Sequence, residues 1–246
     1  MLRHQVSIGM ETFKTVLDKE NLGEPHPTLV GGERWYPADE QRTRDQRAFA
    51  ELHRLGLVDG GRVSDDFADT LAVLQRAAVE FYTFATVEGV RVTARTAAIG
   101  RDAVLIIARD AMIDLYPIPA EQLAIQLATA MPVVPAAQAH SMTCAAADLK
   151  AIQAGKTLAL TNSVKDAKRM TRWLEMERSN VGQLFAAVRD GAGSRRATAA
   201  PVPSWIDTES GRILLSPATH GWYTLSGADS LTIAGRLEQL EKELRG

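Results

Sequence analysis

Residues 79–118 read VEFYTFATVEGVRVTARTAAIGRDAVLIIARDAMIDLYPI, and this stretch decides the fold. Apolar and polar residues alternate with a period of two in the runs VEFYTFATV, VRVTART, DAVLIIA and MIDLYPI, which is typical of β-strands. Only the turn signals Glu88-Gly89, Gly100-Arg101-Asp102 and Arg109-Asp110 separate these runs. Connections this short join antiparallel neighbours, so the stretch predicts four strands of one antiparallel sheet.

Helical patterns surround these strands. Apolar residues at helical spacing predict a short helix that follows Ser7 and ends near Gly23, and a solvated helix with one packing stripe over 38–56. Residues 23–37 between them are expected to form a loop or a brief edge strand. Residues 119–131 form a further predicted helix, which Pro132 and Pro135 terminate.

The second half of the chain has the same order of elements. Residues 141–155 and 162–178 are predicted to be helical or partly so, and a closing helix is predicted over 226–246, where Ser226 and Asp229 resemble a capping box. The strands predicted between them are 181–190, 194–207, 211–216 and 221–226.

The two halves, about 1–135 and 136–246, can be laid over each other so that Tyr116 corresponds to Tyr223. We therefore predict an α+β fold in which a central antiparallel β-sheet is flanked by two helical bundles, with a quasi-twofold internal duplication within a single domain.

Composition argues against several classes of partner. The net charge of −2 and the pI near 6.2 give no reason to expect a nucleic acid. The N-terminus lacks the continuous apolar core of a secretory signal, and the apolar run at 103–108 is too short to span a bilayer, so we expect a cytoplasmic protein without membrane insertion. The lone Cys144 is expected to be a small buried hydrophobic residue rather than a nucleophile.

The stretch SWIDTESGRILL (204–215) raises the question of an acidic catalytic cluster. Asp207 and Glu209 lie between two predicted strands, in a segment with the polar residues and the glycine that a hairpin turn requires. We therefore expect a turn on a solvated loop. The competing hypothesis is a hydrolase that uses Asp207 or Glu209 with His220.

Metal and nucleotide sites lack their signatures. The five histidines are scattered without an i, i+4 pair, and Gly191-Ala-Gly193-Ser194 leads into a strand rather than a phosphate-binding helix. We predict no catalytic activity, no metal and no cofactor. The sequence has two basic runs, one at 165, 168, 169 and 172 and one at 195–196. These runs favour a solvated helix face and a hairpin flank. Trp173 lies beside the first run and adds some weight to an interface with an acidic partner.

Three segments carry a resemblance to a known family. They are AELHRLGLVDGGRVSDDFADTLAVL (50–74), the paired strands at 90–110, and WIDTESGRILL (205–215) with the GWYTLSGADSLTIAGRLEQLE that follows. In this order they resemble the EspG family, the ESX (type VII) secretion-associated chaperones of mycobacteria and related actinobacteria. The resemblance covers nearly the whole chain, through the soft patterns GL-x-D-G-x-R-V and W-x-D-T-x-x-G-R.

The resemblance implies a cytosolic, non-enzymatic chaperone that binds PE–PPE heterodimers at the PPE helical tip, keeps them soluble and delivers them to the ESX machinery. It also implies partner contacts from the loop between the second and third strands and from the C-terminal helical bundle. The matching positions in this sequence are Val87, Glu88, Gly89, Arg169, Arg172, Trp173 and Met176. The 87–89 loop is very short for the family.

An alternative is a ligand-sensing or self-pairing α+β binding module without catalytic activity. It is motivated by the duplicated sheet and by Trp205, Trp222 and Tyr223, which cluster along the late strands, and a concave pocket lined by aromatic residues would favour it. A further alternative is that the free protein forms a weak homodimer.

Overall fold

The computed structural model describes residues 1–29 and 37–246. Its strands are β1 Val6–Gly9, β2 Val58–Asp59, β3 Arg62–Val63, β4 Val79–Val87, β5 Val90–Ile99, β6 Asp102–Arg109, β7 Met112–Pro117, β8 Met142–Ala145, β9 Arg178–Arg189, β10 Arg195–Ala197, β11 Ser204–Thr208, β12 Gly211–Ala218 and β13 Trp222–Gly227. The helices are α1 Met10–Lys19, α2 Ala38–Arg54, α3 Asp65–Arg76, α4 Leu123–Thr129, α5 Ala146–Gln153, α6 Asn162–Leu174 and α7 Ser230–Arg245. Single 3-10 turns lie at Pro27–Leu29, Ala120–Gln122 and Thr219–Gly221.

One large antiparallel sheet organises the molecule, in the strand order β1-β7-β6-β5-β4-β9-β11-β12-β13-β8. The four strands predicted from residues 79–118 are confirmed as β4, β5, β6 and β7, and each pairs antiparallel with the next. Their turns are as short as the sequence indicates. The α+β class with a large antiparallel sheet is therefore the observed one.

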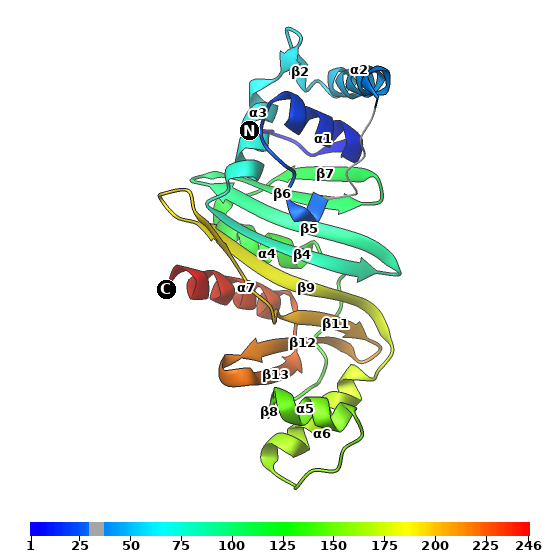
Figure 1. Cartoon of the computed structure of the whole chain (residues 1–246), viewed down its shortest axis with the longest axis vertical. Coiled ribbons are helices and arrows are strands. Elements are labelled where there is room, and N and C mark those ends of the chain that lie inside the picture. Colours follow the sequence, from blue (N-terminus) through cyan, green and yellow to red (C-terminus); the bar gives the residue numbers. More distant parts are fainter. Residues whose placement is uncertain (30–36) are drawn as a thin grey trace.

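Strand β9 joins the two halves of the sheet. Along one edge it pairs with β4 from Val79↔Val188 to Val87↔Asn180. Its other edge pairs first with β11 and then, beyond Gln183, with β10. Figure 1 shows β9 as the long, curved strand in the middle of the molecule.

The helices form three groups. Helices α1, α2 and α3 lie at one end of the molecule, and α5 and α6 lie at the other (Figure 1). Helices α4 and α7 pack against each other and onto β4, β5 and β9 near the middle. The sequence predicts helices at both ends of the sheet but does not predict this central pair as a group of its own.

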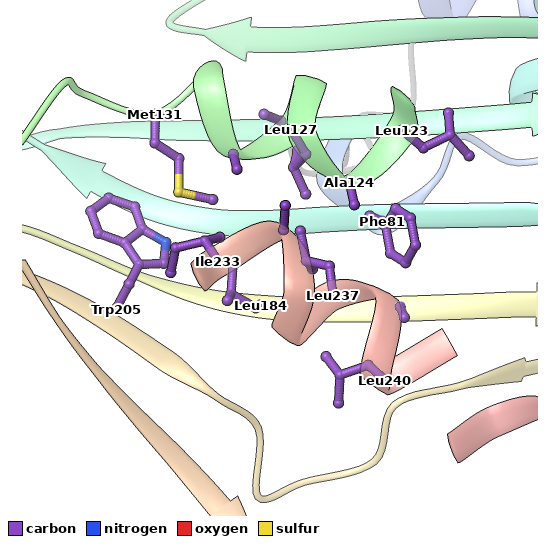
Figure 2. Close-up of a cluster of buried hydrophobic side chains, with 14 of the residues drawn as sticks. Phe81, Leu123, Ala124, Leu127, Met131, Leu184, Trp205, Ile233, Leu237 and Leu240 are labelled. Carbon is purple, nitrogen blue, oxygen red and sulfur yellow. The ribbon is translucent and has the colours of Figure 1, made fainter. Parts of the chain in front are cut away.

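The largest apolar core lies under α4 and α7 and takes side chains from both halves of the chain. Figure 2 shows Leu127 of α4 and Leu237 of α7 directed at the same cluster, which also contains Trp205. All three side chains are fully buried. Two further cores lie under α1–α3 and under α5–α6. Among residues 1–29 and 37–246, no helix is long and apolar enough to cross a membrane.

The structure corrects several local predictions. Residues 6–9 and 142–145 are edge strands placed just before α1 and α5, whereas the sequence predicted a helix following Ser7, a wholly or partly helical segment over 141–155, and no strand at either place. The strand expected over 194–207 is two strands, β10 and β11, with a loop between them. Short edge strands like these have too few residues to show a period of their own.

The cap of the closing helix also differs from the prediction. Asp229 is itself the N-cap, and its carboxylate accepts the backbone N–H of Thr232 at 2.8 Å. Ser226 belongs instead to strand β13. In the segment 23–37, Pro27–Leu29 form a 3-10 turn, and residues 30–36 lie outside the described part of the chain.

Candidate partner-binding site

The turn between β4 and β5 is a two-residue hairpin loop closed by the pair Val87↔Val90. Glu88 and Gly89 both have left-handed backbones, with φ of 50° and 80°, which is the geometry of a type I′ turn. Glu88 and Gly89 are exposed, whereas Val87 is half-buried and packs on the central core. The left-handed region favours Gly, Asn or Asp, so a glutamate there costs about 1 kcal/mol.

Helix α6 has one buried and one basic face. Its N-cap Thr161 accepts the backbone N–H of Val164 at 3.2 Å, and Val164, Ala167, Met170, Thr171 and Leu174 face the core. The exposed side chains Lys165, Lys168, Arg169 and Arg172 recur every three or four residues, so they form one stripe. Within this stripe, Arg169 lies 3.5 Å from Asp166.

Trp173 and Met176 lie beside this stripe, at the end of α6. Both are half-buried, and Trp173 packs against the core under α5 and α6. They therefore combine a packing role with a solvent-facing edge, which is the arrangement common among residues that anchor protein interfaces.

The structure brings the two predicted contact segments to the same end of the central strands. Strand β9 begins at Arg178, shortly after α6 ends at Leu174, and its residue Asn180 pairs with Val87. The backbone N–H of Glu88 donates to Oδ1 of Asn180 at 3.0 Å. Figure 1 shows the tip of β4 on the same side of the molecule as the curved start of β9, with α6 further down.

The W-x-D-T-x-x-G-R pattern forms a buried ion pair instead of a solvated acidic loop. Asp207 and Arg212 are both fully buried, and Nε of Arg212 donates to Oδ1 of Asp207 at 2.6 Å while its Nη2 donates to Oδ2 at 2.9 Å. The guanidinium lies 4.8 Å from the ring centre of Trp205. The turn prediction is confirmed for Glu209 and Ser210, but the prediction that Asp207 is solvated is wrong.

The hydrolase hypothesis fails on this geometry. Asp207 has its oxygens engaged by Arg212 and Asn180, and Glu209 is exposed at the turn. His220 follows the far end of β12, about 25 Å along the strand from that turn at the usual rise per residue. No general acid and base therefore face each other there.

Arg212 also holds the connection between the two halves. Its Nη2 donates to the carbonyl of Pro132 at 2.8 Å, and its backbone bonds to Pro135 and Ala137. A Cβ on Gly227 would lie 1.9 Å from the carbonyl oxygen of Ala137, so only glycine fits beneath this connection. The arginine of the W-x-D-T-x-x-G-R pattern and the glycine at 227 are thus explained by the packing of residues 132–137 on the sheet.

A second buried charge cluster was not predicted. Glu80 lies 2.6 Å from Nε of Arg95 and 2.6 Å from Nε of Arg195, and Nε2 of His26 lies 3.6 Å from it. Burial and the two neighbouring guanidiniums lower the pKa of His26 to about 2. Because Arg95 and Arg195 already balance Glu80, the carboxylate does not favour a protonated imidazole. Alternation in the strand placed Glu80 on a sheet face, but the sequence carried no signal for partners so distant along the chain.

Other predicted features have structural roles. Cys144 is fully buried with its Sγ 3.4 Å from Sδ of Met170, and burial raises its thiol pKa to about 11. In the described ranges 1–29 and 37–246, no group of three or more His, Cys, Asp or Glu side chains has the arrangement of a metal site.

The aromatic pocket of the alternative hypothesis is not formed. Trp205 is fully buried in the central core, while Trp222 and Tyr223 are consecutive residues of β13 and point to opposite faces of the sheet. A groove of about 720 Å³ between α7 and strands β12 and β13 is lined by residues such as Ser216, Thr224, Arg236 and Glu243, and none of its lining residues is aromatic.

These features define an α+β protein whose buried polar groups hold the scaffold together, while its candidate functional residues lie on exposed turn and helix surfaces. The family model for the EspG family matches residues 10–239, and the chain belongs to that family. The resemblance predicted from the sequence is thereby confirmed. No curated protein sequence matches the chain.

Among solved structures, the fold is similar to the Mycobacterium tuberculosis type VII secretion system chaperone EspG5, determined in complex with a PE25–PPE41 dimer. The TM-score is 0.73 at 14% sequence identity, over 98% of this chain and 96% of EspG5. At that identity the similarity establishes a shared fold along nearly the whole chain.

Proposed function

We propose that this protein is a type VII secretion chaperone that binds a PE–PPE heterodimer, keeps it soluble and targets it for ESX secretion. The observation that carries the proposal is the match of nearly the whole fold to EspG5, whose structure contains a bound PE25–PPE41 dimer. Membership of the EspG family supports it. On this proposal the protein acts in the cytoplasm, without a cofactor or a catalytic step.

The physical task of such a chaperone is to cover an apolar end of its partner. An exposed apolar patch at the tip of a helical protein promotes aggregation, and a stable protein interface buries about 800 Å² on each side. The net charge of −2 keeps long-range repulsion between the chaperone and its partner small.

We place the partner-binding site on the β4–β5 turn and the end of α6, at Val87, Glu88, Gly89, Arg169, Arg172, Trp173 and Met176. The hydrogen bond from Glu88 to Asn180 supports a single continuous site, because Asn180 follows α6 closely along the chain. Trp173 supplies an apolar anchor, and Arg172 and Arg169 supply donors for acidic or carbonyl groups of the partner.

We also propose that the chain is one domain that arose by duplication of halves close to 1–135 and 136–246. The strand order supports this. Read from one edge to the centre, the sheet has the order β1-β7-β6-β5-β4, and read from the other edge to the centre it has the matching order β8-β13-β12-β11-β9. Each half begins with a short strand followed by helices, and ends with a helix, α4 or α7, that packs on the shared core.

Co-expression tests the function. PE–PPE pairs encoded in the genome that encodes this chain are expressed with and without it, and the soluble PPE protein is quantified. The proposal predicts that at least one pair becomes soluble only with this protein and co-purifies with it. If every pair is equally soluble without it and none co-purifies, the chaperone assignment is wrong.

Two variants test the site. Arg172→Glu reverses a charge on an exposed side chain and should weaken PE–PPE binding without lowering the unfolding midpoint, and Trp173→Ala should weaken it further. Arg42→Glu is the matched control, because Arg42 is also exposed but lies on α2 at the opposite end of the molecule. Equal binding by Arg172→Glu and Arg42→Glu would remove α6 from the site.

A further inference from the structure

Asn180 uses both ends of its side-chain amide, although it lies at the edge of the candidate site and not on its surface. It is 7% exposed. Its Oδ1 accepts the backbone N–H of Glu88 at 3.0 Å, and its Nδ2 donates to Oδ2 of Asp207 at 2.9 Å. With Asp207 bound in turn by Arg212, this amide cannot rotate without losing one of its two hydrogen bonds.

A β-bulge places Asn180 in this position. Asp207 pairs with Asn180 but Thr208 pairs with Arg178, so Ser179 is the extra residue on β9. The hydroxyl of Ser179 donates to the backbone carbonyl of Asp207 at 3.3 Å. The bulge therefore brings the start of β9 close to Asp207 at two successive residues.

The same few residues also hold the end of α6. Nη2 of Arg178 donates to the carbonyl oxygen of Leu174, the last residue of the helix, at 2.6 Å. Helix α6 and the 87–89 turn are thus bound to neighbouring residues of one strand, and that strand is tied to the buried Asp207–Arg212 pair.

The turn needs such a support. The N–H of Glu88 lies inside the two-residue loop, where the strand ladder provides no acceptor for it, and its backbone is left-handed at a non-glycine residue. Asn180 supplies the missing acceptor and favours the strained conformation over others that the exposed turn could adopt.

We infer that Asn180 is a positioning residue for partner binding, which fixes the 87–89 turn relative to the end of α6 so that the two segments meet the partner as one preformed surface. Preformed binding segments avoid the entropic cost of ordering during association. The inference rests on the proposed function for the identity of the partner, but the positioning itself is a property of the free protein.

Two variants of Asn180 and one control test this. Asn180→Ala removes both hydrogen bonds, and the near-isosteric Asn180→Asp keeps an oxygen for Glu88 but sets a carboxylate against Asp207. The control is Glu51→Ala, which removes the carboxylate that accepts the backbone N–H of Gly9 at 3.0 Å in the other half of the chain. The probe is a PE–PPE dimer that the wild-type protein binds, with PE25–PPE41 included among those tried.

Two measurements are made on each protein: hydrogen exchange of the Glu88 amide in the free protein, and the dissociation constant of the complex. Asn180→Ala should accelerate Glu88 exchange and weaken binding about five-fold or more, as the loss of the hydrogen bond to Glu88 implies, whereas Glu51→Ala should do neither. Asn180→Asp keeps the acceptor for Glu88, so it should accelerate Glu88 exchange less than Asn180→Ala does. The inference is overturned if Asn180→Ala matches the control in either measurement. If the wild-type protein binds no PE–PPE dimer, the proposed function fails instead, and the exchange measurement still decides whether Asn180 holds the turn.

Discussion

The indole of Trp205 occupies the space where Gly182 has no side chain. A Cβ on Gly182 would lie 2.6 Å from Cε2 of Trp205, well inside van der Waals contact. The two residues are direct partners on β9 and β11, and Trp205 is fully buried in the central core. This contact therefore fixes how closely the second half of the sheet approaches the strand that joins it to the first.

Gly182→Ala should lower the free energy of unfolding by about 1–3 kcal/mol, because the added methyl group overpacks a rigid aromatic contact. Chemical denaturation measures the change. Gly235→Ala is the control, since a Cβ at this exposed helical position meets nothing within 4 Å and should raise stability by about 0.5–1 kcal/mol. Equal effects of the two substitutions would contradict the packing argument.

Arg212→Met should destabilise the protein by about 3–5 kcal/mol, because it leaves the buried Asp207 carboxylate without its charged partner and releases the carbonyl of Pro132. For comparison, Arg245→Ala breaks a partly exposed pair with Glu241 at 2.8 Å and should cost at most about 0.5 kcal/mol. Unfolding curves of the two variants give the difference. A loss below about 1 kcal/mol for Arg212→Met would show that the pair is not a structural tie.

Acid should destabilise the protein through His26. The folded-state pKa is lowered to about 2 from an ordinary value of 6.5, so unfolding is accompanied by proton uptake between those values. The stabilising contribution of the neutral imidazole is complete above pH 6.5 and decreases below it by up to about 1.4 kcal/mol per pH unit.

His26→Gln should remove this component of the pH dependence. Unfolding free energies at pH 7, 6 and 5 are compared for the wild type, this variant and His220→Gln, which changes an exposed histidine outside the cluster. The wild type and His220→Gln should lose stability more steeply than His26→Gln. Parallel curves for all three proteins would mean that His26 has the same pKa in the folded and unfolded states.

Cys144 should be unreactive in the folded protein. Burial raises its pKa to about 11, so the thiol stays protonated at pH 8 and is also shielded from reagents. Labelling with a maleimide should be slow without denaturant. It should be complete within minutes in about 6 M guanidinium, which is enough to unfold most proteins. Rapid labelling of the native protein would place Cys144 at the surface.

Features set by local sequence were predictable, and features set by distant partners were not. The strands of 79–118 and the turn at Glu209-Ser210 follow from alternation and turn residues, which act over a few neighbours. The burial of Asp207 depends on Arg212 across a hairpin and on Asn180 in another strand, and the environment of Glu80 depends on His26 and Arg195. Nothing in the local sequence distinguishes such a carboxylate from a solvated one.

The candidate site shows the same division. Its residues at 87–89 and 169–176 came from a family resemblance. The turn at 88–89 and the helical positions of Arg169, Arg172 and Trp173 agree with the local pattern, whereas Met176 lies just beyond α6, which ends at Leu174 and not at 178. The support from Asn180 was missed, because a polar residue at the start of a strand has no special pattern until the bulge at Ser179 is known.

The most direct test of the chaperone assignment is the mass of the complex formed with a PE–PPE pair, measured by light scattering during size-exclusion chromatography. We predict one species that contains one copy each of this protein, PE and PPE, which persists on dilution to concentrations near 1 μM, as expected of a stable interface. Elution of this protein alone, with every PE–PPE pair of its genome migrating separately, would contradict the account.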